Sequence, residues 1–267
     1  MTLTAVQPRK SGDLPAVVSA ITRRHLELLD AALPGRVTGL YLTGSLPLGD
    51  FHPHTSDIDG VVVTSGPVTE LHQLRDIHAE LAGGPAYDVV YLTVAELAGP
   101  PRRDRPAVFT LDGEFKEAPY GGPVSPVLWA ELARGPIVVR ENPGLEVYDD
   151  DAALRAFTRD NLTSYWVPRL DELNAHLDGA PDDAPVETEV FTWFVLGVPR
   201  LHALLTTGEF VSKTAAGHWA AERFGQWAGL CRRTIAARAG EPQAFTVADA
   251  RDAVNLGRAI LADALSG

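Results

Sequence analysis

The chain has 267 residues, of which 45% are hydrophobic and 22% charged, so its composition predicts a packed globular protein and excludes intrinsic disorder. Its formal net charge of −12 would repel a nucleic-acid backbone and favours cationic partners. The single cysteine excludes an internal disulfide, and the sequence shows neither a signal-peptide core nor an apolar run long enough to span a membrane. We therefore expect a cytoplasmic protein with no nucleic-acid or membrane partner.

The first half of the chain alternates between helical and strand patterns. Apolar residues at near-helical spacing predict helices over residues 13–33, 68–82 and 125–135. Runs of β-branched and aromatic residues predict strands over residues 36–43, 57–64, 86–93 and 136–140. The Pro- and Gly-rich sequence from 99 to 126 is expected to be mostly loop.

The pattern changes after Tyr148, where strand-like runs end. Long helical patterns occupy residues 151–177, 188–207, 214–239 and 247–265. A polar linker, "DGAPDDAPVE", separates the first two of them. The sequence therefore predicts an α+β protein, in which a mixed sheet with flanking helices (1–150) is followed by an α-helical bundle domain (151–267).

Two aspartates, Asp57 and Asp59, stand one residue apart at the start of a predicted strand. Side chains alternate across a strand, so both carboxylates point to one face and repel each other unless a cation neutralises them. Mg²⁺ suits such a pair because it prefers hard oxygen ligands and completes its shell with phosphate and water. Asp88, in the next predicted strand, would add a third carboxylate, which is the arrangement of two-metal nucleotidyl transfer.

The loop before the aspartates has the composition of a phosphate-binding loop. Gly44 allows backbone N–H groups to approach a phosphate closely, and the hydroxyl of Ser45 can donate as well. Gly49 permits the next turn. The spacing is not that of the P-loop, because Asp50 stands where the lysine would follow the second glycine.

These residues also have simpler interpretations. An isolated D-x-D at a strand start is usually a turn or a cap. An EF-hand loop needs a further Asp or Asn before the glycine and a Glu after it, and this sequence lacks both. His52 and His54 have no further His or Cys at a zinc-like spacing, so they are interpreted as loop residues.

The whole string "GSLPLGDFHPHTSDID", residues 44–59, resembles the nucleotidyltransferase superfamily that includes DNA polymerase β. Three further stretches resemble the streptomycin/spectinomycin adenylyltransferases: "LDGEFKE", "NLTSYWVPRL" and "VLGVPRLHALLTTGEFVSKTAAGHWAAERF". The resemblance covers most of residues 36–228. It implies a polymerase β-like N-terminal domain, binding of ATP and Mg²⁺ between the two domains, and transfer of AMP to an antibiotic hydroxyl.

The resemblance also implies roles for individual residues. Asp57 and Asp59 would hold Mg²⁺, with two ions expected. Asp88 would act as the general base, as a metal ligand, or as both, although the antibiotic-modifying relatives carry Glu at this position. The nucleotide would be bound by Gly44, Ser45, Ser56 and Lys213. Without the resemblance, Lys213 is interpreted as a solvated lysine in the first turn of a helix.

The acceptor site is expected to suit a polycation, with carboxylates and an aromatic face. The candidates are Glu114, Phe115, Glu187 and Glu189. Phe115 stands where the relatives carry Trp. Glu187 and Glu189 also fit a helix N-terminus, where the helix dipole favours acids.

Three functions remain open from the sequence. The leading one is an aminoglycoside O-adenylyltransferase that uses ATP-Mg²⁺ and releases pyrophosphate. The second is a nucleotidyltransferase that modifies another small molecule or a protein hydroxyl. The third is a catalytically weak nucleotide-binding module.

Overall fold

The structure is a computed structural model that describes residues 2–7, 14–118 and 122–266. The chain divides into two compact units, Met1–Leu154 and Arg155–Gly267. The first unit has a hydrophobic core on each face of its sheet, and the helical unit has a separate core.

The first unit is built on a six-stranded sheet of order β6-β5-β4-β3-β2-β7. Its strands are β2 (Val37–Leu42), β3 (Ile58–Thr64), β4 (Tyr87–Thr93), β5 (Ala107–Leu111), β6 (Glu114–Ala118) and β7 (Ile137–Arg140). The pair β3–β4 is parallel, and the other neighbouring pairs of this sheet are antiparallel. A parallel pair needs a crossover connection, which α2 (Leu71–Leu81) provides between β3 and β4.

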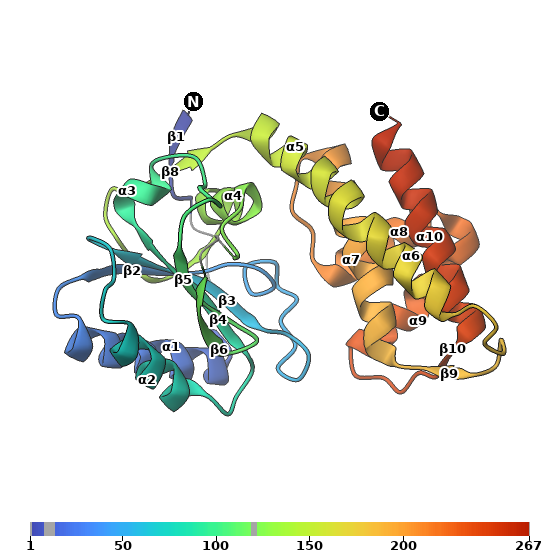
Figure 1. Ribbon diagram of the computed structural model, residues 1–267, viewed down its shortest axis with the longest axis horizontal. Helices are drawn as coiled ribbons and strands as arrows, with labels where there is room; N and C mark the ends of the chain where they lie inside the picture. The colour runs from blue at the N-terminus through green and yellow to red at the C-terminus, as the bar shows by residue number, and fades with distance from the viewer. Residues whose placement is uncertain (1, 8–13, 119–121, 267) are drawn as a thin grey trace. The chain divides into compact units, whose positions relative to one another are not determined.

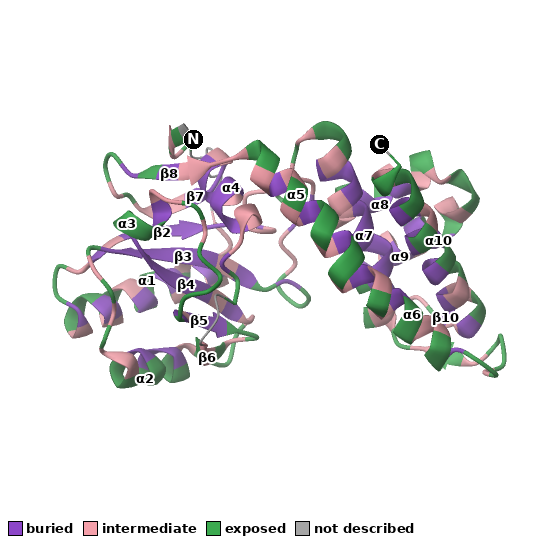
Figure 2. Ribbon diagram, turned by 45° about the horizontal axis from the view of Figure 1, so that its top comes forward, coloured by how far each residue is buried: buried purple, intermediate pink, exposed green. Residues whose placement is uncertain are grey.

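Helices cover both faces of this sheet. In Figure 1, α1 (Ala16–Ala32) and α2 lie on one side, and α3 (Val94–Leu97) and α4 (Pro126–Arg134) lie on the other. Strand residues therefore alternate between two cores: Ile58 and Val62 pack with α1 and α2, whereas Val61 and Val63 pack with α3 and α4. Figure 2 shows the central strands as almost continuously buried, which explains their near-unbroken apolar sequence.

The prediction that residues 99–126 are mostly loop is wrong for the β5–β6 hairpin. Its two-residue turn is Asp112–Gly113, and both residues have positive φ, +54° and +73°. These conformations are those of a type I′ turn, whose twist matches the flanking strands. The signal was the D-G dipeptide between "AVFTL" and "EFKEA". The charged residues of β6 obscured this signal. β6 is an edge strand, and such a strand needs no apolar outer face.

Within the described residues of the first unit, the structure adds three other short elements that the sequence did not predict. The helix α3 begins with a capping box between Thr93 and Glu96. The strands β1 (Thr2–Ala5) and β8 (Glu146–Asp149) pair with each other in a separate antiparallel ribbon. Asp13, where the first helix was predicted to start, lies outside the described residues, and α1 begins at Ala16.

The second unit is helical apart from the two-residue strands β9 (Pro185–Val186) and β10 (Phe245–Thr246). Its described helices are α5 (Asp151–Asn161), which begins in the first unit, α6 (Val167–His176), α7 (Thr188–Thr207), α8 (Lys213–Arg223), α9 (Ala228–Arg238) and α10 (Val247–Leu265). A π-helical turn, Leu162–Trp166, joins α5 to α6. The helix predicted over 214–239 is broken after Arg223, where Phe224 leaves the helical conformation and Gly225 follows.

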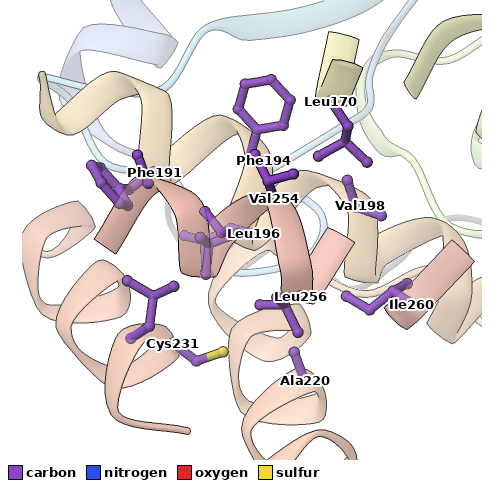
Figure 3. Packing of buried hydrophobic residues seen from close by; sticks show 14 of the residues in the cluster. Leu170, Phe191, Phe194, Leu196, Val198, Ala220, Cys231, Val254, Leu256 and Ile260 are labelled. Carbon is purple, nitrogen blue, oxygen red and sulfur yellow. The ribbon is translucent and has the colours of Figure 1, made fainter. Parts of the chain in front are cut away.

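The central helix of this unit is α7. Among the described helices, it is the one that is long and apolar enough to cross a membrane by length and composition, so the expectation that no apolar run reaches this length is wrong. Its Phe191, Leu196 and Val198 are fully buried in the helical core, as Figure 3 shows. A Cβ at Gly197 would lie 2.9 Å from the ring of Trp166, so the helices pack too closely there for a larger residue. These contacts are those of a core helix.

Candidate active site

Asp59 and Asp88 lie side by side on neighbouring strands. The parallel register of β3 and β4 pairs Asp59 with Asp88 directly. Both residues are in phase with strand residues that pack toward α3 and α4, so both side chains lie on the face opposite α1 and α2. Asp57 precedes β3 by one residue and is exposed. Its charge contributes to the pKa shift of Asp88, so the first two predicted carboxylates are near the third.

The loop after β2 lies directly against Asp59. The backbone N–H of Thr43 donates to the carbonyl of Asp59 at 3.0 Å. Gly44 has φ +67°, and a Cβ at this position would overlap Oδ2 of Asp59. Position 44 therefore requires glycine for two reasons: the backbone is left-handed, and the Asp59 carboxylate occupies the space of a Cβ.

Ser45 carries an unsatisfied polar atom. Within the described part of the chain, its Oγ is the one buried side-chain nitrogen or oxygen that has no hydrogen-bond partner. Leaving a buried hydroxyl unpaired costs about 1–3 kcal/mol, so such an atom calls for an explanation. A phosphate oxygen beside Gly44 would supply the missing acceptor.

The rest of the loop is shaped by internal hydrogen bonds. The N–H of Asp50 donates to the carbonyl of Ser45 at 3.0 Å, and the N–H of His52 donates to Oγ of Ser56 at 3.1 Å. Asp50 is buried and lies 3.2 Å from Nε2 of His52. His52 thus has a structural role in the loop, and nucleotide binding by Ser56 stays a prediction.

Asp88 is held by the β5–β6 turn. Its Oδ2 accepts from the N–H of Asp112 at 3.0 Å, and its Oδ1 accepts from the N–H of Gly113 at 2.8 Å. Burial raises the pKa of the Asp88 carboxyl, the charges of Asp57 and Asp112 raise it further, and the two backbone hydrogen bonds oppose the rise. The sequence did not indicate that this turn belongs to the site, although the D-G dipeptide stands within "LDGEFKE".

The carboxylates of this site can be compared with the ligands that Mg²⁺ requires. Across residues 2–7, 14–118 and 122–266, no three His, Cys, Asp or Glu side chains form a ready-made metal cluster. Mg²⁺ does not need one, because it is commonly bound by one or two carboxylates together with substrate phosphates and water. Asp57 and Asp59 provide those carboxylates beside the unpaired Ser45 hydroxyl, so the donor set fits.

The two acceptor candidates of the first unit point to different faces of β6. Phe115 packs toward α2, where its ring stacks on His78 with centroids 5.9 Å apart and Arg75 lies 5.6 Å from its centroid. The structure therefore does not bring Phe115 to the carboxylates, because the strand alternation turns its ring into the opposite core. Glu114 alternates with it, is exposed and pairs with Lys116 at 2.6 Å.

The predicted residues of the helical unit lie at helix starts. Lys213 is the first residue of α8 and is partly buried after the cap Ser212, whose Oγ accepts from the N–H of Ala215. Glu187 is the N-cap of α7, and Glu189 lies in its first turn; both are exposed. The two glutamates suit a helix N-terminus, where the dipole favours acids. Ligand binding by Lys213, Glu187 and Glu189 stays a prediction.

Comparison with known proteins identifies two family domains. Residues 23–104 match a model described as a nucleotidyltransferase domain. Residues 166–262 match a model described as the C-terminal domain of aminoglycoside adenylyltransferase. No curated protein gives a significant match.

Among solved structures, the chain is similar to the spectinomycin adenyltransferase AAD(9) from Enterococcus faecialis, which was crystallised with ATP and spectinomycin. The sequences are 15% identical, the match covers 91% of this chain and 98% of the other, and the TM-score is 0.65. At this identity the likeness concerns the fold. Together with the two family domains, it confirms the predicted α+β class, with a mixed-sheet nucleotidyltransferase domain followed by a helical domain.

Proposed function

The chain belongs to the aminoglycoside adenylyltransferase family, and on this premise we propose that it transfers AMP from ATP to a hydroxyl of a cationic aminoglycoside-type antibiotic. The observation that carries the proposal is the pairing of Asp59 with Asp88 beside a loop whose Ser45 hydroxyl is buried and unpaired. A structure-stabilising acid pair would need neither the close approach of Gly44 nor the unpaired hydroxyl.

Each residue of the site has a separate task in this reaction. Gly44 and Ser45 bind the triphosphate, and Asp57 and Asp59 would hold Mg²⁺. When bound, the metal would offset the negative charge of the phosphates. Asp88 accepts the proton of the acceptor hydroxyl, whose oxygen forms a bond to the α-phosphorus. The bond between the α-phosphorus and the bridging oxygen breaks, and pyrophosphate leaves.

A raised pKa suits Asp88 to this task. A general base works best when its pKa approaches the operating pH, and burial together with neighbouring charges moves the pKa of Asp88 in that direction. Its two backbone hydrogen bonds leave further lone pairs on both oxygens, so the carboxylate can still accept a proton.

The acceptor is proposed to be cationic because the chain is acidic, with a net charge of −12. Glu114 is exposed and directly follows the turn whose N–H groups contact Asp88. The spectinomycin bound by the similar Enterococcus faecialis enzyme is one candidate acceptor. Transfer to a drug would make the protein an antibiotic-resistance enzyme of the cytoplasm, where ATP is available.

The decisive experiment is a pair of isosteric substitutions with a matched control. We expect Asp57→Asn and Asp59→Asn each to reduce AMP transfer by at least about 10³-fold, because an amide cannot replace an anionic ligand. Asp76→Asn removes an exposed carboxylate from α2 on the opposite face and should leave transfer unchanged. Transfer is measured with α-labelled ATP and an aminoglycoside panel, and stability by thermal unfolding. Near wild-type transfer by either active-site variant would refute this assignment.

The same assay separates the two alternatives. Label incorporated into a protein band or another metabolite, but into no drug, would favour a different acceptor. Tight ATP binding in calorimetry without turnover on any acceptor would favour a nucleotide-binding module.

A further inference from the structure

We propose that the Asp112–Gly113 turn of the β5–β6 hairpin is a positioning element for Asp88 in AMP transfer. The inference rests on the proposed function, in which Asp88 receives the proton of the acceptor. The turn orients the Asp88 carboxylate and so sets the direction in which its free lone pairs point.

The geometry behind this inference is a two-point contact. The backbone N–H of Asp112 lies 3.0 Å from Oδ2 of Asp88, and the N–H of Gly113 lies 2.8 Å from Oδ1. One donor on each oxygen defines the plane of the carboxylate as well as its position. A single hydrogen bond would leave the group free to rotate about the Cβ–Cγ bond, where the preference for particular rotamers is weak.

Asp88 needs such an anchor because its surroundings disfavour a charged, fixed side chain. The residue is partly buried, and the charges of Asp57 and Asp112 both act against its ionised form. Backbone N–H groups carry no net charge, so they hold the anion in place without the adjacent cation that would lower the pKa of the base much further. An aspartate is also short, so small rotations of its carboxylate decide whether it meets the acceptor oxygen.

The turn can present both N–H groups to Asp88 because both residues adopt the left-handed conformation. Asp112 has φ +54° and Gly113 has φ +73°; among the described non-glycine residues, Asp112 is the one with positive φ. A Cβ at Gly113 would meet its nearest atoms, in Ala86 and Tyr87, at 3.8 and 3.9 Å, which is ordinary contact. A side chain at position 113 therefore strains the backbone without a steric clash. A substitution there tests the conformation of the turn and leaves its packing intact.

The experiment compares Gly113→Ala with Gly144→Ala. Gly144 lies in the turn between β7 and β8, has φ +79° and has nothing near its Cβ position, so both substitutions carry a similar backbone cost. We expect both variants to lose a similar amount of thermal stability. Only Gly113→Ala should lower kcat for AMP transfer, by about tenfold, with little change in KM for ATP. Equal kcat in the two variants would overturn the proposal.

A graded series at position 113 distinguishes turn conformation from side-chain volume. Asn tolerates the left-handed region better than Ala, although it is larger, and the β-branched Val tolerates it least. We expect kcat to fall in the order Gly, Asn, Ala, Val. An order that follows side-chain size, with Ala ahead of Asn, would show that the turn acts through packing.

Amide hydrogen exchange tests the contact independently of activity. The Asp112 and Gly113 amides should be protected in the wild-type protein and lose protection in Asp88→Ala, while the amides of β3 stay protected. Wild-type amides that exchange freely would overturn the positioning role. If the wild-type protein transfers no AMP but these amides lose protection in Asp88→Ala, the proposed function fails while the contact itself stands.

Discussion

At the scale of single residues, the site depends on a close approach that only glycine permits. The Asp59 carboxylate occupies the space in which a side chain at position 44 would begin, and Ser45 next to it has an unpaired hydroxyl. The loop and the strand thereby form one surface. A phosphate bound by the loop would lie beside the carboxylate proposed to hold Mg²⁺.

Gly44→Ala and Gly49→Ala test this close approach in one loop. Both glycines have the same left-handed backbone, with φ +67° and +69°, but a Cβ at 49 meets nothing within 4 Å. Each substitution should therefore cost about 1–2 kcal/mol of stability. Gly44→Ala must also displace Asp59, so we expect it to lower kcat/KM for ATP at least about tenfold more than Gly49→Ala does. Equal losses in steady-state assays would show that the approach to Asp59 has no functional role.

At the scale of elements, a buried polar network ties α1 and α2 to β4. In α1, His25 places Nδ1 at 2.9 Å from Oη of Tyr87 and Nε2 at 2.9 Å from Oη of Tyr91. In α2, His78 places Nε2 at 2.8 Å from the same Tyr91 hydroxyl. The two tyrosines flank Asp88 along the strand on the opposite face. The network thus supports the strand that carries the proposed base.

This network predicts a loss of stability in mild acid. Burial lowers the pKa of His78 from 6.5 to about 4, and burial together with the His78 charge lowers the pKa of His25 well below its usual value. A lowered histidine pKa means that the unfolded chain binds more protons below pH 6.5, so stability is complete above that pH and declines toward pH 4. His78 alone should account for about 2 kcal/mol between pH 7 and pH 5.

Urea unfolding at pH 7 and pH 5 measures this effect. In His78→Gln, which retains a hydrogen-bonding side chain but cannot titrate, the difference in unfolding free energy between the two pH values should shrink by about that amount. A difference as large as that of the wild type would exclude His78 as its source. The interval lies above the usual range of carboxylates, so their protonation contributes little to the measurement.

At the scale of the whole molecule, the chain has two compact units with separate cores. The proposed carboxylates and the phosphate loop belong to the first unit, whereas Lys213 begins a helix of the second. We propose that the helical domain closes over the nucleotide when ATP binds. This closure requires Lys213 to act across the two units.

Lys213→Ala tests this cooperation. Loss of a cation that offsets the triphosphate should weaken ATP-Mg²⁺ binding by about tenfold, or about 1.4 kcal/mol, in calorimetry. Lys213→Arg should restore part of the affinity. Arg232→Ala removes one exposed positive charge from α9 of the same unit and should leave the affinity unchanged. Wild-type affinity for ATP-Mg²⁺ in Lys213→Ala would instead favour the interpretation of Lys213 as a solvated lysine in the first turn of a helix.

Some of the architecture could be predicted because local patterns specify it. The helices α7 and α10 begin and end as predicted, since apolar periodicity and terminal signals agree there. The central strands were clear because burial on both faces makes them continuously apolar. The hairpin β5–β6 was missed because its outer strand is polar, and the break after Arg223 was missed because the apolar pattern continues through it.

The sequence by itself determined the type of chemistry, since the order Gly-Ser, Gly and Asp-x-Asp indicates a nucleotidyltransferase wherever the strands lie. Only the tertiary structure decided which residues share the site. Register across two strands pairs Asp59 with Asp88, a turn 24 residues further along the chain holds Asp88, and strand alternation directs Phe115 into the opposite core. These relations depend on which strand pairs with which, and non-local pairing leaves little trace in a single sequence.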